Sequence, residues 1–233
     1  AKDAINAGKH VLCEKPITIS SKEFTELSEL AKARGVFLME AMWTYFLPAL
    51  KQAKKWLSEG RIGNLKHIKT DFGYPMPYVR GGREYEPSLA GGSLLDMGIY
   101  PIAIAHYFLE NDFELLNVHA QYAPSGVDDD VVMLGKANDV MVNLATSFKC
   151  RLGNSAYIIG DEGYILIPDA FRASECFLHK GDDLIEHFCD ERKSLGYNFE
   201  ADEVVEAIKN GLLESDVMNH EKSLKLQRQM EEI

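Results

Sequence analysis

The first 40 residues alternate between helical spacing of apolar residues and short apolar runs. The runs at residues 10–13 and 36–39 are typical of short buried strands. Between them, residues 20–35 repeat apolar side chains at helical spacing, behind a Ser-x-x-Glu capping box and ahead of a glycine. Residues 1–8 add one more short helix. The order helix, strand, helix, strand predicts a parallel sheet with right-handed crossovers.

Beyond residue 64 the pattern changes to short runs that alternate apolar and polar positions, as half-exposed strands do. The predicted strands are 65–72, 113–122, 131–136, 140–148, 155–159, 164–167, 174–179 and 183–187. Helical spacing predicts further helices at 47–60, 93–109, 201–212 and 221–233. The fold class is therefore α/β plus α+β: part of a parallel α/β domain, followed by a mostly antiparallel, open-faced sheet with helices on one face.

One long segment, residues 73–92, has no periodicity and is rich in glycine, proline, tyrosine and arginine. A stretch of about 20 such residues within a compact domain is usually functional or mobile. Its arginines, Arg80 and Arg83, can clamp an acidic or hydroxylated substrate, and a solvated loop explains them equally well. Further along the chain, Asp128-Asp129-Asp130 is expected to form a turn with a solvated face.

Composition excludes several classes of partner. The chain has 233 residues and 46% hydrophobic content, enough for a sizeable core. Its net charge of −11 argues against nucleic acid and against an anionic membrane, because both select basic patches. No apolar run approaches the roughly 20 residues of a membrane span, so none is expected.

Cysteine usage argues against a metal site and indicates the compartment. The four cysteines are Cys13, Cys150, Cys176 and Cys189. They include no C-x-x-C pair and have no histidine at metal-ligand spacing, which predicts neither a zinc site nor a disulfide framework. Free thiols of this kind are typical of a reducing cytoplasm, which is the location we expect.

Glu14-Lys15-Pro16 is the first of two segments that carry candidate chemistry. It follows the apolar run at residues 10–13, so it lies at the carboxyl end of a predicted strand. Ligands of open α/β sheets bind at that edge, and the segment places a cation and a carboxylate there. Pro16 then turns the chain out of the sheet, because it cannot donate a ladder hydrogen bond. A solvated lysine at a strand end is the alternative interpretation of Lys15.

The second segment is Gly91–Pro101, at the start of a predicted helix. Its two glycines allow the backbone to pass close to a ligand. Ser93 is expected to cap the helix, with Asp96 reaching back as in a capping box. Asp96 and Tyr100 are four residues apart and therefore share one helix face. Taken singly, such an aspartate is most often a cap and such a tyrosine a core residue, but their combination favours a site.

Together these motifs resemble the glucose–fructose oxidoreductase/inositol dehydrogenase/MocA (Gfo/Idh/MocA) family. The resemblance rests on Glu14-Lys15-Pro16, on residues 37–43 (Phe-Leu-Met-Glu-Ala-Met-Trp) and on Gly91–Pro101, and it runs essentially from end to end. Met-Glu-Ala-Met-Trp and the tyrosine four residues after the aspartate are most similar to the dihydrodiol dehydrogenase-like branch. The family consists of NAD(P)-dependent oxidoreductases with an amino-terminal Rossmann domain.

The resemblance implies roles for individual residues. Lys15 is expected beside the nicotinamide and the substrate, Tyr100 as the proton donor or acceptor, and Asp96 as a group that orients the substrate hydroxyl or Lys15. A tyrosine with a reference pKa of about 10 needs a nearby ammonium to act near neutrality. The expected cofactor-binding residues are Glu14, Lys15, Pro16 and Trp43. The expected substrate-binding residues are Arg83, Asp96 and Tyr100, and no metal is expected.

The expected domain organisation is incomplete at the amino terminus. No G-x-G-x-x-G turn follows any predicted strand, so we expect a truncated family member whose pyrophosphate cradle would lie ahead of the first residue. A carboxyl-terminal Rossmann remnant is expected over 1–46, and a substrate and dimerisation domain over 47–215. A terminal helix over 216–233 is expected to pack back toward the Rossmann part. Relatives also imply a homodimer through the antiparallel sheet.

Three functions fit these observations. The first is an oxidoreductase that transfers a hydride between NAD or NADP and a sugar, polyol or dihydrodiol. The second is a non-catalytic sugar-binding or dimerisation module that has lost cofactor binding and keeps Lys15, Asp96 and Tyr100 as remnants. The third is an NAD-dependent glycosidase of the same superfamily.

Overall fold

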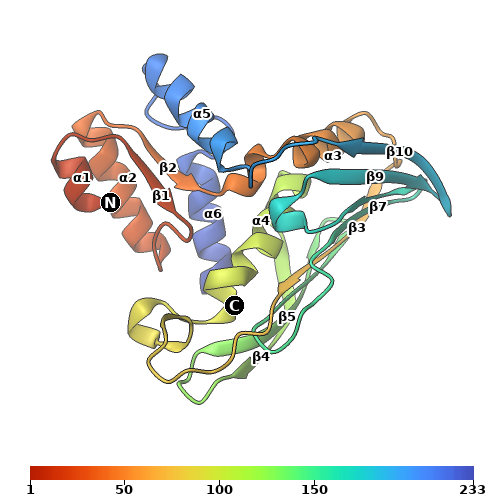
Figure 1. The fold of residues 1–233 in the computed structure, drawn as a ribbon, viewed down its shortest axis with the longest axis horizontal. Coiled ribbons are helices and arrows are strands. Elements are labelled where there is room, and N and C mark those ends of the chain that lie inside the picture. Colours follow the sequence, from red (N-terminus) through yellow and green to blue (C-terminus); the bar gives the residue numbers. More distant parts are fainter. The chain divides into compact units, whose positions relative to one another are not determined.

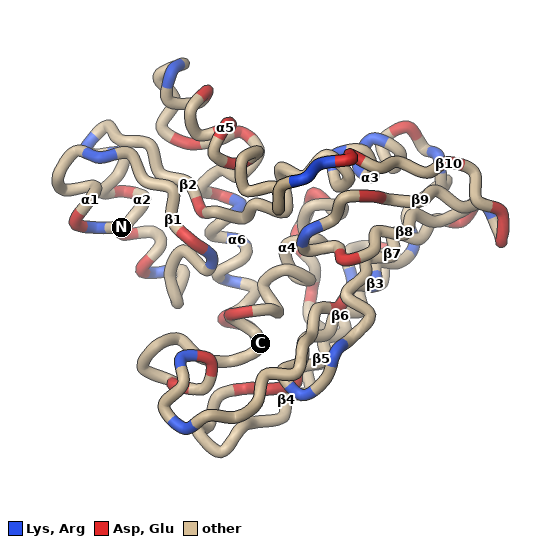
Figure 2. The backbone as a smooth tube through the Cα atoms, in the orientation of Figure 1, with Lys and Arg blue, Asp and Glu red and all other residues tan.

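The computed structural model describes residues 1–233, which form two compact units (Figure 1). Unit 1 comprises Ala1–Phe46 and Ser194–Ile233, and unit 2 comprises Leu47–Lys193. The expected division after residue 46 coincides with the first boundary. Residues 194–215, expected in the substrate domain, lie instead in unit 1. Figure 2 shows acidic and basic residues interspersed along both units.

Unit 1 contains a two-stranded parallel sheet flanked by helices, as the alternating pattern predicted. Strand β1 pairs in parallel with β2, and Glu14 lies opposite Ala41 at the end of the ladder. Helix α6 packs against α2, where the Ser21 N–H and hydroxyl donate to the Glu231 carboxylate at 2.8 and 2.6 Å. The elements of unit 1 are α1 (Lys2–Asn6), β1 (Val11–Glu14), α2 (Ser21–Arg34), β2 (Leu38–Ala41), a 3₁₀ helix (Trp43–Phe46), α5 (Tyr197–Lys209) and α6 (His220–Glu231).

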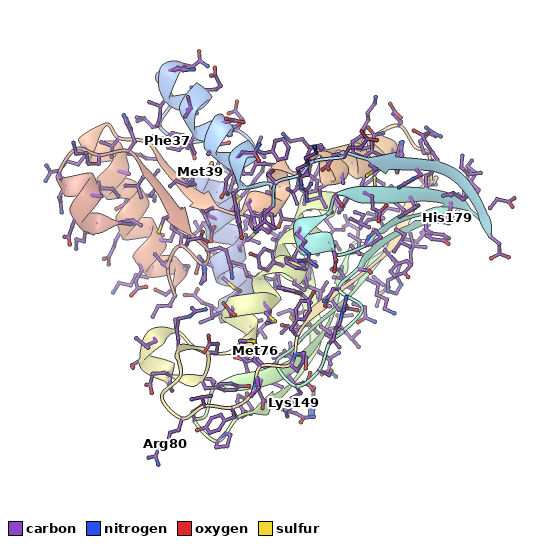
Figure 3. All side chains as sticks on the ribbon, viewed as in Figure 1. Phe37, Met39, Met76, Arg80, Lys149 and His179 are labelled. Carbon is purple, nitrogen blue, oxygen red and sulfur yellow. The ribbon has the colours of Figure 1, made fainter.

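The ends of α2 are those that the sequence predicted. The Ser20 hydroxyl accepts a hydrogen bond from the Glu23 N–H, and Gly35 closes the helix in the left-handed conformation at φ 62°. The buried face of the helix carries Phe24 and Ala31, which contribute to the core of unit 1. Phe37 and Met39, labelled beside β2 in Figure 3, are fully buried.

Unit 2 is built on one eight-stranded sheet in the order β10-β9-β8-β7-β3-β6-β5-β4. Only the β3–β6 pair is parallel, so the sheet is largely antiparallel, as predicted. Its strands are β3 (Leu65–Gly73), β4 (Glu114–Tyr122), β5 (Asp128–Ala137), β6 (Val140–Ser147), β7 (Ala156–Gly160), β8 (Tyr164–Ile167), β9 (Glu175–Lys180) and β10 (Asp183–Cys189). Its helices are α3 (Pro48–Ser58) and α4 (Ile99–Leu109), with shorter turns between.

The sheet of unit 2 is covered on one face. Helix α3 packs on β8 and β9, and α4 packs on β3 and β6. Side chains on the covered face, such as Met133, Leu144 and Ile158, are completely buried. On the other face the apolar side chains are exposed; among them are Leu116, Val132, Leu134 and Met141 of β4, β5 and β6. The predicted open-faced sheet is therefore confirmed.

One helical segment differs from the expectation about apolar runs. By length and composition alone, the 23 residues Pro87–Leu109 are long and apolar enough to cross a membrane. However, 61% of the apolar window is buried inside the protein, and α4 packs on the sheet of unit 2. A buried core helix passes the same test of length and composition, and core packing accounts for the apolar character of this segment.

Candidate active site

The predicted site residues fall into two groups, one in each unit. Glu14, Lys15, Pro16 and Trp43 belong to unit 1, whereas Arg83, Asp96 and Tyr100 belong to unit 2.

In unit 1, Glu14-Lys15-Pro16 lies at the carboxyl end of a parallel strand pair. Glu14 is the last residue of β1 and is exposed, whereas Lys15 and Pro16 are half-buried in the turn that follows. The Lys15–Pro16 peptide bond is cis. The segment has the position predicted for it, since ligands of open α/β sheets bind beyond the carboxyl ends of the strands.

Trp43 packs within unit 1. It begins the 3₁₀ helix that follows β2 and is only 4% exposed. Its ring lies 4.4 Å from that of Tyr197, the first residue of α5, at an interplanar angle of 33°. The contact fixes the start of α5 against the chain that leaves the sheet, and contact with a cofactor stays a prediction.

Two buried carboxyl groups in unit 1 are residues that the sequence reasoning missed. Burial raises the pKa of Glu40 to about 7, and burial together with the charge of Glu14 raises that of Glu200 to about 7. One carboxyl oxygen of each is buried without a hydrogen-bond partner. For Glu40, the signal in the sequence was a glutamate within an otherwise apolar run. In the structure all four residues of that run, strand β2, are buried.

In unit 2, Asp96 and Tyr100 lie on either side of a change in helix geometry. Residues Leu94–Gly98 form a single π-helical turn, and the α-helix begins only at Ile99. Asp96 is at the centre of this turn, whereas Tyr100 is the second residue of α4 and is 7% exposed. Such π-helical turns occur frequently at functional sites.

The start of this helical segment is held by a residue from the sheet, not by the predicted capping box. Asp128 Oδ2 accepts hydrogen bonds from the Ser93 hydroxyl and from the Leu94 N–H, both at 2.7 Å. Ser93 is therefore a donor to Asp128, and its side chain accepts no cap hydrogen bond. The carbonyl of Ser93 accepts a further bond from the Thr146 hydroxyl at 3.2 Å. Strands β5 and β6 thus fix the first turn.

The two glycines of this segment accommodate the protein's own chain. A Cβ on Gly91 would lie 2.8 Å from backbone atoms of Glu84 and Glu86. A Cβ on Gly92, whose φ is 122°, would lie 2.4 Å from Asp128 Oδ1. These glycines were expected to let the backbone pass close to a ligand. In the structure they let it pass close to other residues of unit 2.

The triple aspartate is also placed differently from the expectation. Asp128 opens β5, and Asp129 is only 8% exposed and pairs with the Lys149 ammonium at 3.0 Å. The segment is therefore neither a turn nor a solvated face. The donors at the helix start bond to Asp128, and the Lys149 ammonium, just after β6, neutralises the buried Asp129.

Of the two arginines in the long irregular segment, one contacts a predicted catalytic residue. Arg83 Nη2 donates to Asp96 Oδ1 at 3.1 Å, and the two side chains are 63% and 24% exposed. Arg80 is exposed and points away from the ribbon (Figure 3). The structure thus brings together two of the three substrate-binding residues predicted, Arg83 and Asp96.

Aromatic rings surround Tyr100. Its ring meets Phe72 edge-on at 5.4 Å and Phe171 at 5.9 Å, and Phe72 and Phe171 stack on each other at 4.1 Å. Tyr74 completes this aromatic cluster, 5.7 Å from Phe72. The phenol of Tyr100 therefore lies in an apolar setting, and its role in proton transfer stays a prediction.

Sequence profiles of two known domains match the two parts of the chain. Residues 1–42 match the oxidoreductase family with an NAD-binding Rossmann fold, and residues 50–166 match the GFO/IDH/MocA C-terminal domain. The chain belongs to the Gfo/Idh/MocA oxidoreductase family. This confirms the predicted family and its class of cofactor, a nicotinamide dinucleotide.

The chain is similar to curated members of this family named trans-1,2-dihydrobenzene-1,2-diol dehydrogenase. It is 33% identical to that of Macaca fuscata fuscata over 220 residues, or 91% of this chain. The human protein is 32% identical over 235 residues, covering 97% of this chain and 70% of the human sequence. The chain spans 65% of the length of the Macaca protein.

Solved structures of family members have the same fold. The 3-ketoreductase KijD10 from Actinomadura kijaniata, in complex with NADP and TDP-benzene, matches this chain with a TM-score of 0.89 at 26% sequence identity. The match covers the whole of this chain and 72% of the KijD10 chain. Aldose-aldose oxidoreductase from Caulobacter crescentus, complexed with glycerol, matches with a TM-score of 0.90 at 22% sequence identity. The match covers 99% of this chain and 70% of the oxidoreductase chain, and at this identity it shows a shared fold alone. The predicted fold class is confirmed.

Proposed function

We propose that the protein carrying this chain transfers a hydride between NAD or NADP and a sugar, polyol or dihydrodiol. The observation that carries the proposal is the setting of Tyr100. It is a buried phenol in an aromatic cluster, one turn from an aspartate that Arg83 holds, on a helix start that Asp128 fixes. Family membership and the names of the relatives support the same reaction class.

Tyr100 is the proposed proton donor or acceptor. Reduction of a carbonyl leaves an alkoxide that must be protonated, and oxidation of an alcohol requires the reverse transfer. The proposed task of the aromatic cluster is to keep water away from the phenol. The proposed task of the preceding π-helical turn is to set the orientation of the Tyr100 side chain. Lys15 is proposed to lie beside the nicotinamide and the substrate, where a positive charge favours an ionised oxygen.

Asp96 and Arg83 are the proposed groups that orient the substrate. Arg83 fixes one oxygen of the Asp96 carboxylate at 3.1 Å, and the carboxylate can accept a hydrogen bond from a substrate hydroxyl. Since the aspartate is only 24% exposed, its orientation is defined more narrowly than that of a solvated carboxylate.

Glu14, Lys15, Pro16 and Trp43 are the residues proposed to hold the cofactor. They fit this role chemically, because a cation and a half-buried proline occupy the carboxyl end of parallel strands, where dinucleotides bind in this class of fold. When bound, the nicotinamide accepts or supplies the hydride. The residues of this chain position it and handle the proton.

The aromatic cluster supports a diol or sugar ring as the substrate. Flat apolar rings beside a carboxylate fit a ligand that has one apolar face and several hydroxyl groups. The relatives named dihydrodiol dehydrogenase, and KijD10 with its TDP-benzene, bind or act on ring compounds according to their names.

A homodimer in the cytoplasm completes the proposal. The open face of the unit 2 sheet exposes Leu116, Val132, Leu134 and Met141 on adjacent strands, which is the composition of a surface that a second copy can cover. All four cysteines are free, which fits a reducing compartment.

The decisive experiment is Tyr100→Phe in the protein that carries this chain. We expect kcat to fall by at least about 100-fold with either nicotinamide cofactor, which is the usual contribution of a general acid or base. Trans-dihydrodiols, aldoses and polyols would be assayed with NAD and NADP by nicotinamide absorbance. Tyr107→Phe, on the same helix, is the matched control. Near-normal turnover of Tyr100→Phe would exclude the proposed role, and hydrolysis of glycosides without net oxidation would favour the glycosidase.

A further inference from the structure

Glu40 is the most deeply buried ionisable side chain near the predicted cofactor residues of unit 1. It lies in β2 opposite Cys13 of β1 and is 1% exposed. Its Oε1 accepts a buried hydrogen bond of 3.0 Å from the N–H of Ile17, which is 23 residues earlier in the chain. The carboxyl group therefore reaches across from one strand to the turn that contains Lys15 and Pro16.

The second carboxyl oxygen of Glu40 lowers the stability of the folded chain when the group is ionised. Oε2 is buried without a hydrogen bond of standard geometry, and a buried carboxylate loses much of its hydration energy. Burial accordingly raises the pKa of Glu40 to about 7, against the opposing influence of the Ile17 N–H, the Ser223 hydroxyl of α6 and the Lys15 ammonium. The other titratable group that senses this charge is Cys13, whose thiol pKa is raised by burial and then by Glu40.

A neutral residue would perform the structural task at lower cost. A glutamine has the same shape, and its side-chain oxygen can accept the Ile17 N–H equally well. A buried carboxylate also carries a desolvation cost that a neutral amide of the same shape largely avoids. Buried ionisable groups with a specific charged partner occur frequently at functional sites. The charge of Glu40 therefore needs an explanation beyond packing.

We propose that Glu40 is a positioning residue for Lys15: its buried carboxyl group holds the Lys15–Ile17 turn and gives the Lys15 ammonium a fixed counter-charge. This inference rests on the proposed function in one respect, the role of Lys15 in the reaction. The coupling between the two side chains is a property of unit 1 alone.

Such a coupling has two reciprocal consequences. The Glu40 carboxylate favours the ammonium form of Lys15 and so raises the Lys15 pKa, and the Lys15 ammonium lowers that of Glu40. Near neutral pH, protonation of Glu40 removes the counter-charge without breaking the turn, because Oε1 remains an acceptor for Ile17. In the working enzyme, this would change how strongly Lys15 acts on its neighbours.

The first test measures the lysine. Lysines of the chain are ¹³C-methylated, the Lys15 signal is assigned by its absence in Lys15→Arg, and its titration is followed by NMR above pH 8, where Glu40 is ionised. We expect Glu40→Gln to lower the Lys15 pKa by at least about half a unit. Glu26→Gln, an exposed glutamate on α2, should leave it unchanged. An unchanged Lys15 titration in folded Glu40→Gln would overturn the proposal.

The second test measures the glutamate and does not require Glu40 variants to fold. Carboxyl-¹³C-labelled chain reports the titration of Glu40, which we expect near pH 7. In Lys15→Gln this pKa should rise, because the ammonium that lowers it has been removed. A Glu40 pKa that does not respond to Lys15→Gln would overturn the proposal.

Activity then separates the inference from the proposed function. In the active protein, Glu40→Gln should lower kcat more than it raises KM and should displace the pH profile of kcat, with partial rescue by Glu40→Asp. A coupling seen by NMR together with normal turnover of Tyr100→Phe would support the coupling and overturn the proposed function. Loss of turnover in Tyr100→Phe without any coupling by NMR would support the proposed function and overturn the coupling of Glu40 to Lys15.

Discussion

The residues around the two groups of candidate site residues satisfy their polar atoms in different ways. In unit 2, Asp128 accepts two hydrogen bonds of 2.7 Å at the helix start, and Asp96 accepts one from Arg83. In unit 1, Glu40 and Glu200 each bury one carboxyl oxygen that has no donor. Unit 2 therefore fixes the directions of its side chains through hydrogen bonds, whereas unit 1 keeps buried carboxyl groups that are close to titration at neutral pH.

This difference corresponds to different tasks. A group that moves a proton at a defined atom, the role proposed for Tyr100, benefits from rigid neighbours such as the aromatic cluster. A group that acts by its charge, the role proposed for Lys15, depends on the charges around it, and the Glu40 carboxyl group is one of them. Buried unpaired carboxyl groups lower stability but strengthen electrostatic interactions, because the local dielectric constant is low.

The largest expected effect is a loss of stability with rising pH that originates in unit 1. Glu40 and Glu200 have folded pKa values of about 7, above the ordinary 4.5, so the native state binds their protons more tightly than the unfolded state does. The free energy of unfolding should therefore fall between about pH 4.5 and pH 7, by up to about 3 kcal/mol for Glu40 and less for Glu200. Urea unfolding at several pH values measures it.

The double variant Glu40→Gln/Glu200→Gln is the matched test of this effect. It should remove most of the pH dependence over this interval and be more stable than the natural chain at pH 8. If the slope persists unchanged in the double variant, the two carboxyl groups are not its source, and the contrast between the units is lost.

The next effect concerns the helix start of unit 2. Asp128→Ala removes the acceptor of both the Ser93 hydroxyl and the Leu94 N–H, which should lower the free energy of unfolding by about 1–2 kcal/mol. Asp128→Asn keeps an oxygen acceptor and should lose less. Chemical denaturation compares them, with the exposed Asp139→Ala as control. Equal stability of Asp128→Ala and the natural chain would show that the helix start does not depend on Asp128.

A smaller effect is expected from the ring pair of unit 1. A double-mutant cycle with Trp43→Leu and Tyr197→Leu should give a coupling energy of about 0.5–1.5 kcal/mol, typical of aromatic pairs. Urea unfolding of the four proteins measures it. Additive single effects would mean that the stacking does not hold the start of α5.

The smallest expected change in stability is that of Arg83→Ala. The arginine is 63% exposed, so loss of its ion pair with Asp96 should change the free energy of unfolding by less than about 0.5 kcal/mol. If Arg83 orients Asp96, kcat/KM should nevertheless fall by about tenfold or more. Arg80→Ala, at an exposed side chain of the same segment, is the control for activity. A fall in kcat/KM as large in Arg80→Ala would indicate a general effect of loop charge.

Much of the fold could be predicted because its signals are local. The capping box of Ser20 and Glu23 and the terminal Gly35 place α2 to within a residue. Alternation of apolar residues predicted the strands of unit 2, and β8 has the bounds predicted for it. The start of β5 was missed because Asp128-Asp129-Asp130 has the composition of a turn, and only pairing with neighbouring strands makes it a strand.

The candidate site was predicted as a set of residues and not as a set of contacts. The sequence indicated Lys15, Asp96 and Tyr100 through their motifs. It also suggested that the Ser93 side chain accepts a cap hydrogen bond, whereas in the structure its hydroxyl donates to Asp128. Glu40 was visible only as a charged residue in an apolar run, and nothing local distinguishes a functional carboxyl group there from a structural one.

The sequence by itself determined most of the helices and strands, the face of each that is apolar, and the family to which the chain belongs. These properties depend on residues a few positions apart. The tertiary structure alone decided that Asp128 holds the start of a helix 35 residues away, and that Glu40 binds the amide of Ile17. Both hydrogen bonds join segments that meet only when strands pair in register, and no local pattern encodes the register between distant strands.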